Sequence, residues 1–96
     1  MNECTDLNEV RESIDKVDKE IIQLIAERSF YVHQAAKFKK DKNDVQSPDR
    51  VKKVIEKVRL LGKENGVDED LVEKVYTCMI ESFINLELKE YDNINK

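Results

Sequence analysis

One charged residue stands in an otherwise apolar series along the first part of the chain. The series repeats every three or four residues and consists of Leu7, Val10, Ile14, Val17, Ile21, Leu24, Arg28, Tyr31, Ala35 and Phe38. This spacing is typical of the helix face that packs against a protein interior. A cation placed there without a partner is costly. We therefore expect Arg28 to meet an anion, which is either a carboxylate of another helix or an acidic ligand.

Lys39 and Glu87 are two further candidates for chemistry. On a continuous helix Lys39 shares a face with Arg28 about 16 Å away, so the two cations could hold a small dianion between them. The lysine-rich end KFKKDK also suits a helix C-terminus without any function. Glu87 continues the apolar face of a later helix. Glu87 thus lies on or beside the apolar face. Without a function it would either pair with Arg28 or stand at an exposed helix end, and spacing alone favours the exposed end.

Arg11 and Arg50 stand near helix beginnings, where the helix dipole disfavours a cation. Arg11 lies about 25 Å from Arg28 along the helix axis. It would reach the same site only from a second chain, and its alternative is a surface pair with Asp15. Arg50 is otherwise a solvated side chain.

Three helices must position these residues. The first is expected from about Asp6 or Leu7 to Lys40, with Asp6 as N-cap and Glu9 three residues later as in a capping box. The second opens with Ser47 as N-cap and Pro48 as its first residue, and ends at Asn65-Gly66. The third begins after Asp68 and fades near Tyr91. Breaks at residues 41–48 and 62–68 separate the three helices. With three helices and no predicted strand, the expected fold class is all-α.

The first helix is too long for a monomer of this size. It measures roughly 50 Å, whereas a compact chain of 96 residues has a radius of gyration of only about 12 to 13 Å. We therefore expect residues 1–96 to form a single domain, long-short-long in its helices, that pairs into an intertwined helical homodimer.

Composition excludes several classes of protein. The net charge is -4, which argues against nucleic-acid binding. No apolar run approaches the roughly 20 residues of a membrane span, and the N-terminus does not resemble a signal peptide. Two distant cysteines suggest free thiols in a reducing, cytoplasmic setting. One histidine and the absence of a CxxC pair argue against a metal site.

Taken together, these charged residues on a long-short-long helical layout resemble the all-helical chorismate mutase family. The resemblance covers about residues 5 to 92. LNEVRESIDKVDKEIIQLIAER is similar to the first-helix signature of the family. CTDL, YVHQAAKFK and SPDRV are similar to the isochorismate-pyruvate lyase branch in particular. The combined signature is specific for the superfamily and much less specific for the reaction.

The resemblance implies an intertwined homodimer with two equivalent sites for a small cyclohexadiene dicarboxylate, and no cofactor or metal. Arg11 matches the arginine that crosses from the partner chain, and Arg28 the arginine of the same chain that binds a carboxylate. Lys39 matches the lysine that donates to the ether oxygen of the enolpyruvyl group. Arg50 matches the arginine that opens the second helix at the site. Glu87 stands where bacterial mutases usually have glutamine, the second donor to that oxygen.

Two departures from the family pattern bear on the reaction. Ser47, counted here with the substrate-binding residues, and Val51 stand where the best-known bacterial mutases have acids that contact the ring hydroxyl of chorismate. Their absence makes this loop more similar to the lyase. In addition, an ionised Glu87 cannot donate to an ether oxygen. It would have to be protonated, which an apolar setting can achieve.

The function implied is a Claisen rearrangement of chorismate to prephenate in aromatic amino-acid biosynthesis. The alternative is an isochorismate-pyruvate lyase that forms salicylate and pyruvate. A third possibility is a mutase of 4-amino-4-deoxychorismate. From a different class, a non-catalytic helical dimerisation module would hold Arg11, Arg28, Lys39 and Glu87 in internal salt bridges and leave no open pocket.

Overall fold

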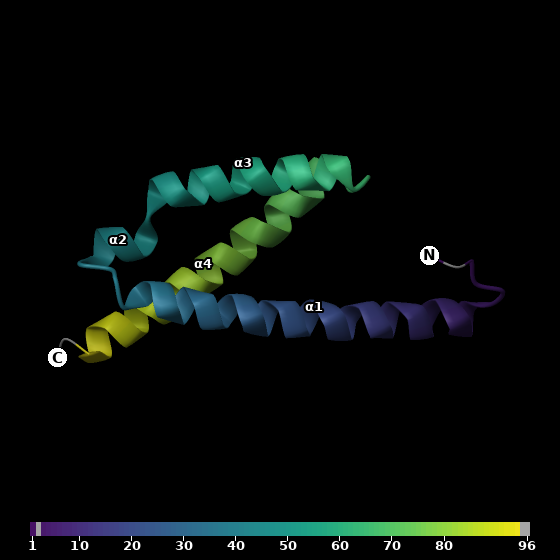
Figure 1. The fold of residues 1–96 in the computed structure, drawn as a ribbon, viewed down its shortest axis with the longest axis horizontal. Coiled ribbons are helices and arrows are strands. Elements are labelled where there is room, and N and C mark those ends of the chain that lie inside the picture. The colour runs from purple at the N-terminus through teal and green to yellow at the C-terminus, as the bar shows by residue number, and fades with distance from the viewer. Residues whose placement is uncertain (2, 95–96) are drawn as a thin grey trace. The chain divides into compact units, whose positions relative to one another are not determined.

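A computed structural model describes residue 1 and residues 3–94, and this part of the chain is helical without a strand. The helices are α1 (Leu7–Ala36), α2 (Lys42–Gln46), α3 (Pro48–Glu64) and α4 (Glu69–Ile94) (Figure 1). The three predicted helices are confirmed as α1, α3 and α4. The short helix α2 was not predicted and lies inside the expected break at residues 41–48.

The chain divides into two compact units, Met1–Val32 and His33–Lys96, which are described separately. Whether they form the predicted single domain stays a prediction. In the first unit the beginning of α1 is capped as expected. The Asp6 carboxylate accepts the backbone N–H of Glu9 at 2.8 Å, and the Glu9 carboxylate accepts the N–H of Thr5 at 2.8 Å. The first bond confirms Asp6 as the N-cap. In a capping box Glu9 would accept from the N–H of Asp6, whereas here it accepts from Thr5, one residue earlier.

Helix α1 buries none of its residues within the single chain. Its apolar series is exposed along the helix, with Leu7 at 59%, Val10 at 38% and Leu24 at 63%. Tyr31 and Phe38, which the spacing assigns to packing, are exposed as well. A helix with an apolar stripe gains most of its stability from packing that stripe. Within a single chain, the apolar face of α1 is therefore not packed against other residues as the spacing predicts.

Helix α1 ends at Ala36, earlier than the predicted Lys40. The backbone N–H groups of Lys37, Phe38 and Lys39 bond to the carbonyl three residues earlier, at 3.0 to 3.3 Å, so the chain tightens after the last helical turn. The Lys40 N–H then bonds to the Asp44 carboxylate at 2.9 Å. Lys39 therefore lies beyond the helix, and the predicted 16 Å spacing from Arg28 along one helix face does not apply.

Helix α2 is a single capped turn. Asp41 is its N-cap and accepts the N–H of Asp44 at 2.8 Å. Its apolar residue Val45 is only 3% exposed, the lowest value in the described core. Helix α2 contacts α4, and Val45 anchors it there because burial of an apolar side chain stabilises the contact.

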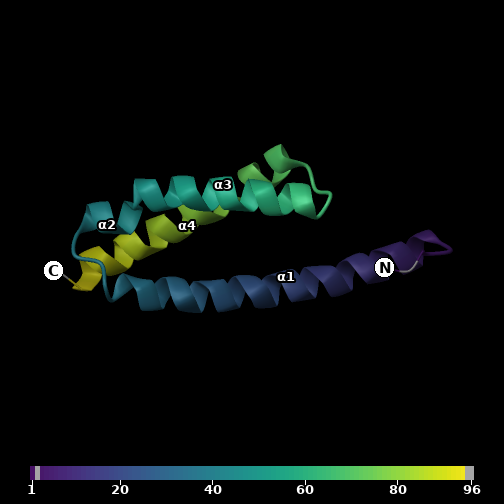
Figure 2. The same ribbon diagram turned by 45° about the horizontal axis from the view of Figure 1, so that its top comes forward.

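Helices α3 and α4 contact each other and lie closest near the turn that joins them, and they diverge toward the beginning of α3 (Figure 1 and Figure 2). Gly66, at φ +71, takes the left-handed conformation that ends α3 at the predicted place. Gly62 is buried where α3 and α4 approach most closely, and an added Cβ there would lie 2.9 Å from Cγ2 of Val72. Arg59 joins the two helices through Asp70 at 3.0 Å and Glu73 at 3.2 Å.

The described core is small, with Val45, Val58 and Ile80 as its buried apolar residues. Spacing on the third predicted helix favours Cys78 as a small buried apolar group, but Cys78 is exposed and its thiol is free. The described helices include none that is long and apolar enough to cross a membrane.

Candidate functional site

Lys39 and Glu87 meet in the second unit. The Lys39 ammonium donates to Oε2 of Glu87 at 3.1 Å. The Glu87 side chain is only 6% exposed, so the expectation of an exposed helix end is wrong for this residue. Glu87 lies in α4 four residues after Phe83, on the half-buried face. The helix continues past it to Ile94, and the carboxylate faces the segment before α2 that carries Lys39.

The Lys39 ammonium has a second contact, the backbone carbonyl of Val45 at 3.5 Å. The two acceptors come from α4 and α2, and an ammonium has three N–H groups. One N–H is therefore available for a ligand. The sequence interpretation did not include Val45, although it is the lone apolar residue in the polar segment DKNDVQS. That isolation was the signal that could have revealed it.

Three polar contacts tie the end of α4 to the segment around Lys39. His33 Nδ1 lies 3.2 Å from a Glu90 carboxylate oxygen, and Lys42 pairs with Asp92 at 3.1 Å. The Tyr91 hydroxyl is 3.5 Å from the Lys40 carbonyl. His33 is half-exposed, in agreement with its position off the apolar series. These contacts join the same two segments as the Lys39–Glu87 pair.

Ser47 joins α2 to α3 and takes the left-handed conformation, φ 40. It is the N-cap of α3, as predicted, but its side chain makes no cap hydrogen bond. Its hydroxyl instead donates to the Asp44 carbonyl, because Ser47 also serves as the C-cap of α2. The hydroxyl oxygen keeps lone pairs that could accept a hydrogen bond from a ligand.

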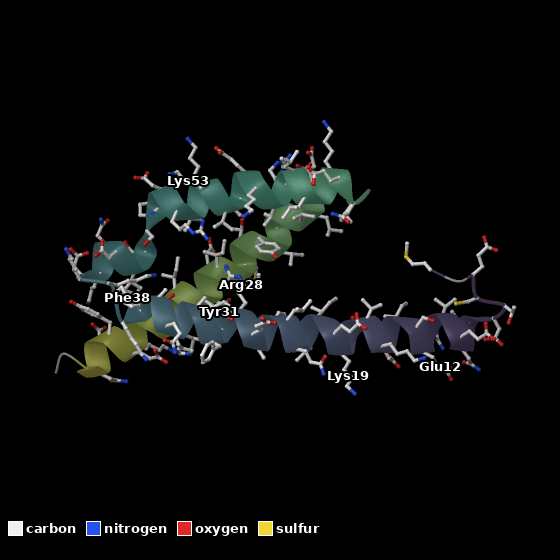
Figure 3. The ribbon with its side chains drawn as sticks, viewed as in Figure 1. Glu12, Lys19, Arg28, Tyr31, Phe38 and Lys53 are labelled. Carbon is white, nitrogen blue, oxygen red and sulfur yellow. The ribbon has the colours of Figure 1, made fainter. Side chains whose placement is uncertain are left out.

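The arginines are placed differently. Arg50 is exposed on the first turn of α3. In the first unit Arg11 is exposed and, within the described part of the chain, has neither an ion pair nor a hydrogen bond, so the alternative pair with Asp15 is not formed. Arg28 is half-buried. Figure 3 shows Arg28 on the side of α1 opposite to Glu12 and Lys19.

In the second unit Lys39 and Glu87 neutralise each other, and the exposed Arg50 adds a fixed positive charge. The ammonium of Lys39 can offer one hydrogen to a negative charge on a ligand. A non-catalytic module would hold Arg11, Arg28, Lys39 and Glu87 in internal salt bridges. The Lys39–Glu87 pair agrees with that alternative, whereas Arg11 forms no such bridge within the described residues.

The family described as "Chorismate mutase type II" matches residues 10–88, most of the chain. The chain belongs to the chorismate mutase type II family. The matched residues include all six candidates, Arg11, Arg28, Lys39, Ser47, Arg50 and Glu87. The all-helical fold expected from the resemblance agrees with membership of this family.

Relatives with two different activities are similar to this family member. The isochorismate pyruvate lyase of Pseudomonas aeruginosa is 32% identical over 91% of the chain and 86% of its own length. The chorismate mutase of Methanocaldococcus jannaschii is 35% identical over 94% of the chain and 95% of its own length. A bifunctional chorismate mutase/prephenate dehydratase of Buchnera aphidicola is 30% identical over 90% of the chain, which spans 23% of that protein. The family is thus established, and both activities occur among its relatives.

Proposed function

We propose that the protein is a chorismate mutase, which converts chorismate to prephenate by a Claisen rearrangement. The ether C–O bond breaks and a C–C bond forms within one cyclic movement of electron pairs. The product is an isomer of the substrate, so no proton, electron or atom is exchanged overall. The observation that carries the proposal is the ammonium of Lys39, held by Glu87 at 3.1 Å in a chain of this family.

Lys39 would donate its remaining N–H to the ether oxygen, where negative charge develops as the C–O bond breaks. A donor that is already oriented stabilises such charge without reorganisation during the reaction. The contacts with Glu87 and Val45 support this role, because they fix the position of the ammonium before the substrate arrives.

Glu87 is the second proposed catalytic group. Its position 3.1 Å from the Lys39 ammonium supports a contact with the same substrate atom. As a protonated acid it would donate to the same ether oxygen as Lys39. As a carboxylate it can only accept hydrogen bonds.

The arginines would bind the two carboxylates of the substrate and hold it in its reactive conformation. We assign this role to Arg28 and Arg50 of one chain and to Arg11 of the partner in an intertwined homodimer. The exposed apolar series on α1 supports the dimer, because a second chain would bury it. Ser47 would accept from a ring substituent of the substrate.

The second candidate function is isochorismate-pyruvate lyase. Two observations favour it: the 32% identical lyase, and Ser47 and Val51 in place of the acids expected at the ring hydroxyl. Its substrate is also an enolpyruvyl dicarboxylate, so the same cations would bind it.

The test is to incubate the purified protein separately with chorismate and with isochorismate. The values of kcat/KM are measured for prephenate and for salicylate plus pyruvate. Efficient prephenate formation supports the mutase. Efficient salicylate formation with slow prephenate formation assigns the lyase, and no turnover of either substrate rejects both.

A further inference from the structure

The position of the Lys39 ammonium depends on how the backbone of Lys39 is held. Helix α1 ends at Ala36, so this backbone lies outside the helix. The Lys39 N–H bonds to the Ala36 carbonyl at 3.2 Å, in the turn that follows the last helical residues. A lysine side chain is long and flexible, and the direction of its ammonium therefore depends on where its backbone lies. Any group that fixes the backbone beside Lys39 helps to direct the ammonium.

The backbone of Lys40, the next residue, is held on both sides. The Lys40 N–H donates to Oδ2 of Asp44 at 2.9 Å, and the Tyr91 hydroxyl donates to the Lys40 carbonyl at 3.5 Å. Side chains of α2 and α4 thus engage both backbone polar groups of the residue that follows Lys39. The bond to Asp44 is the stronger of the two, because it is shorter and its acceptor is a carboxylate.

Asp44 is suited to this task because its own position is fixed. Its N–H donates to the Asp41 carboxylate at 2.8 Å, and its carbonyl accepts the Ser47 hydroxyl. The next residue, Val45, anchors α2 with a buried side chain. The carbonyl of Val45 is also the second acceptor of the Lys39 ammonium, at 3.5 Å. Two adjacent residues of α2 therefore bind the backbone after Lys39 and the end of its side chain.

We propose that Asp44 is a positioning residue for the Lys39 ammonium. Its carboxylate holds the Lys40 backbone against α2, which brings the ammonium to Val45 and Glu87 and leaves one N–H for a ligand. The inference rests on the proposed function for the identity of that ligand. Asp44 acts through Lys39 and exchanges no proton with the substrate.

A purely structural role of Asp44 makes different predictions. An acid in the first turn favours a helix through the helix dipole, and that effect does not depend on Lys39. Asp44→Ala removes the acceptor, whereas Asp44→Asn keeps an oxygen that can accept the Lys40 N–H. Asn43→Ala is the matched control, because the Asn43 side chain is exposed in the same turn and makes no hydrogen bond to another described residue.

The first measurement needs no substrate. The full-length chain is acetylated briefly with a trace of acetic anhydride, and mass spectrometry of its peptides gives the relative rate at Lys39, with the exposed Lys63 as internal reference. The Lys39 nitrogen must leave its two acceptors to react. We expect Asp44→Ala to raise the rate at Lys39 by about fivefold, as for the loss of one hydrogen bond of average strength. Asp44→Asn and Asn43→Ala should stay close to the wild type.

The second measurement is a double-variant cycle on the substrate that the wild type converts. Asp44→Ala is expected to lower kcat by about tenfold with little change in KM, because a displaced ammonium stabilises the transition state less and affects ground-state binding little. In the Lys39→Ala background the same change should alter kcat by less than about twofold, since the group through which Asp44 acts is gone.

Faster labelling of Lys39 in Asp44→Ala, with rescue by Asp44→Asn, supports the inference. An unchanged labelling rate would overturn it, as would an equal fall of kcat in the presence and in the absence of the Lys39 side chain. A wild type that converts neither chorismate nor isochorismate rejects the proposed function instead, and the labelling rates then decide the inference on their own.

Discussion

The ammonium of Lys39 and the carboxylate of Glu87 lie 3.1 Å apart although 48 positions separate them in the chain. Neither residue is on α1, and the contact joins the segment before α2 to the late turns of α4. Val45 supports it from α2 with a carbonyl at 3.5 Å and a side chain that is 3% exposed. The ion pair is thus built by tertiary packing within the second unit.

Lys39→Ala is expected to lower kcat by about 10²- to 10³-fold, the usual loss when one preorganised donor is removed. The value of KM should change far less, because the charge that this donor stabilises develops in the transition state. Steady-state kinetics on chorismate measures both constants. Lys40→Ala is the matched control, since Lys40 makes its hydrogen bonds to other described residues through its backbone. Equal kcat in Lys39→Ala and wild type would reject the role of Lys39.

Glu87→Ala is expected to lower kcat by about 10²- to 10³-fold, because it removes one of the two proposed donors to the ether oxygen. Glu87→Gln should retain far more activity, since its amide keeps a donor at the position of the carboxyl. Steady-state kinetics on chorismate at one fixed pH compares both variants with the wild type. Equal kcat in Glu87→Ala and the wild type would remove Glu87 from the donor role.

The helices could be predicted well where caps and periodicity agree. Asp6 and Glu9 mark the beginning of α1, and Pro48 and Gly66 bracket α3. The end of α1 could not be predicted, because the lysine-rich stretch keeps good helix propensity through Lys40. The side chains of Asp41 and Asp44 instead bond to nearby backbone N–H groups and favour a turn and a new helix.

The site was only partly visible in the sequence. Spacing placed Glu87 on or beside an apolar face, but it could not decide between burial and an exposed end, because that depends on how the segment before α2 packs on α4. The pairing of Glu87 with Lys39 depends on the same packing. The hydrogen bond from the Ser47 hydroxyl to the Asp44 carbonyl could not be predicted either. It accompanies the left-handed backbone conformation of Ser47, which a serine at this position does not indicate.

Arg11 and Arg28 offer a test of the proposed intertwined dimer. If each site combines Arg28 of one chain with Arg11 of the other, Arg11→Ala and Arg28→Ala should each be nearly inactive alone. A mixed dimer of the two variants has one site with both arginines and one with neither. Unfolding and refolding an equal mixture gives about half mixed dimers, so about a quarter of wild-type activity should return.

The control for this mixture is Arg28→Ala refolded with Lys39→Ala. In the proposed site Arg28 and Lys39 come from the same chain and act with Arg11 of the partner, so this mixture should restore far less activity. Mixed dimers of this control have one site without Arg28 and one without Lys39. Recovery of activity only in the Arg11 mixture supports the crossing of chains. A mixture as inactive as its components would show that Arg11 does not act across subunits.

Gly62→Ala is expected to destabilise the contact between α3 and α4. The new Cβ would lie 2.9 Å from Cγ2 of Val72 and 3.4 Å from the Val67 carbonyl. Overpacking of this kind costs about 1 to 3 kcal/mol, against which alanine gains up to about 1 kcal/mol of helix propensity over glycine. Denaturant unfolding at a fixed protein concentration measures the net loss.

Val72→Ala supplies the matched comparison for Gly62→Ala. Removing the valine methyl groups makes room for the new Cβ. The double variant should therefore lose less free energy of unfolding than the sum of the two single variants, by about 0.5 kcal/mol or more. Additive losses would show that the close approach of Gly62 to Val72 does not limit what fits between α3 and α4.

The beginning of α1 should respond to acid through Glu9. The hydrogen bond from the Thr5 backbone N–H lowers the pKa of the Glu9 carboxyl from its usual value. A carboxyl whose pKa is lowered by folding contributes stability that is present above its unfolded pKa and is lost as pH falls through the folded value. The Thr5 amide should therefore lose protection from hydrogen exchange as the pH falls through the lowered pKa of Glu9, while amides in the middle of α1 keep theirs until the whole chain unfolds. In Glu9→Gln the protection of Thr5 should be weaker at neutral pH and almost independent of pH, with Glu12→Gln as an exposed control on the same helix. Loss of Thr5 protection at the same pH in wild type and Glu9→Gln would assign the acid response to another group.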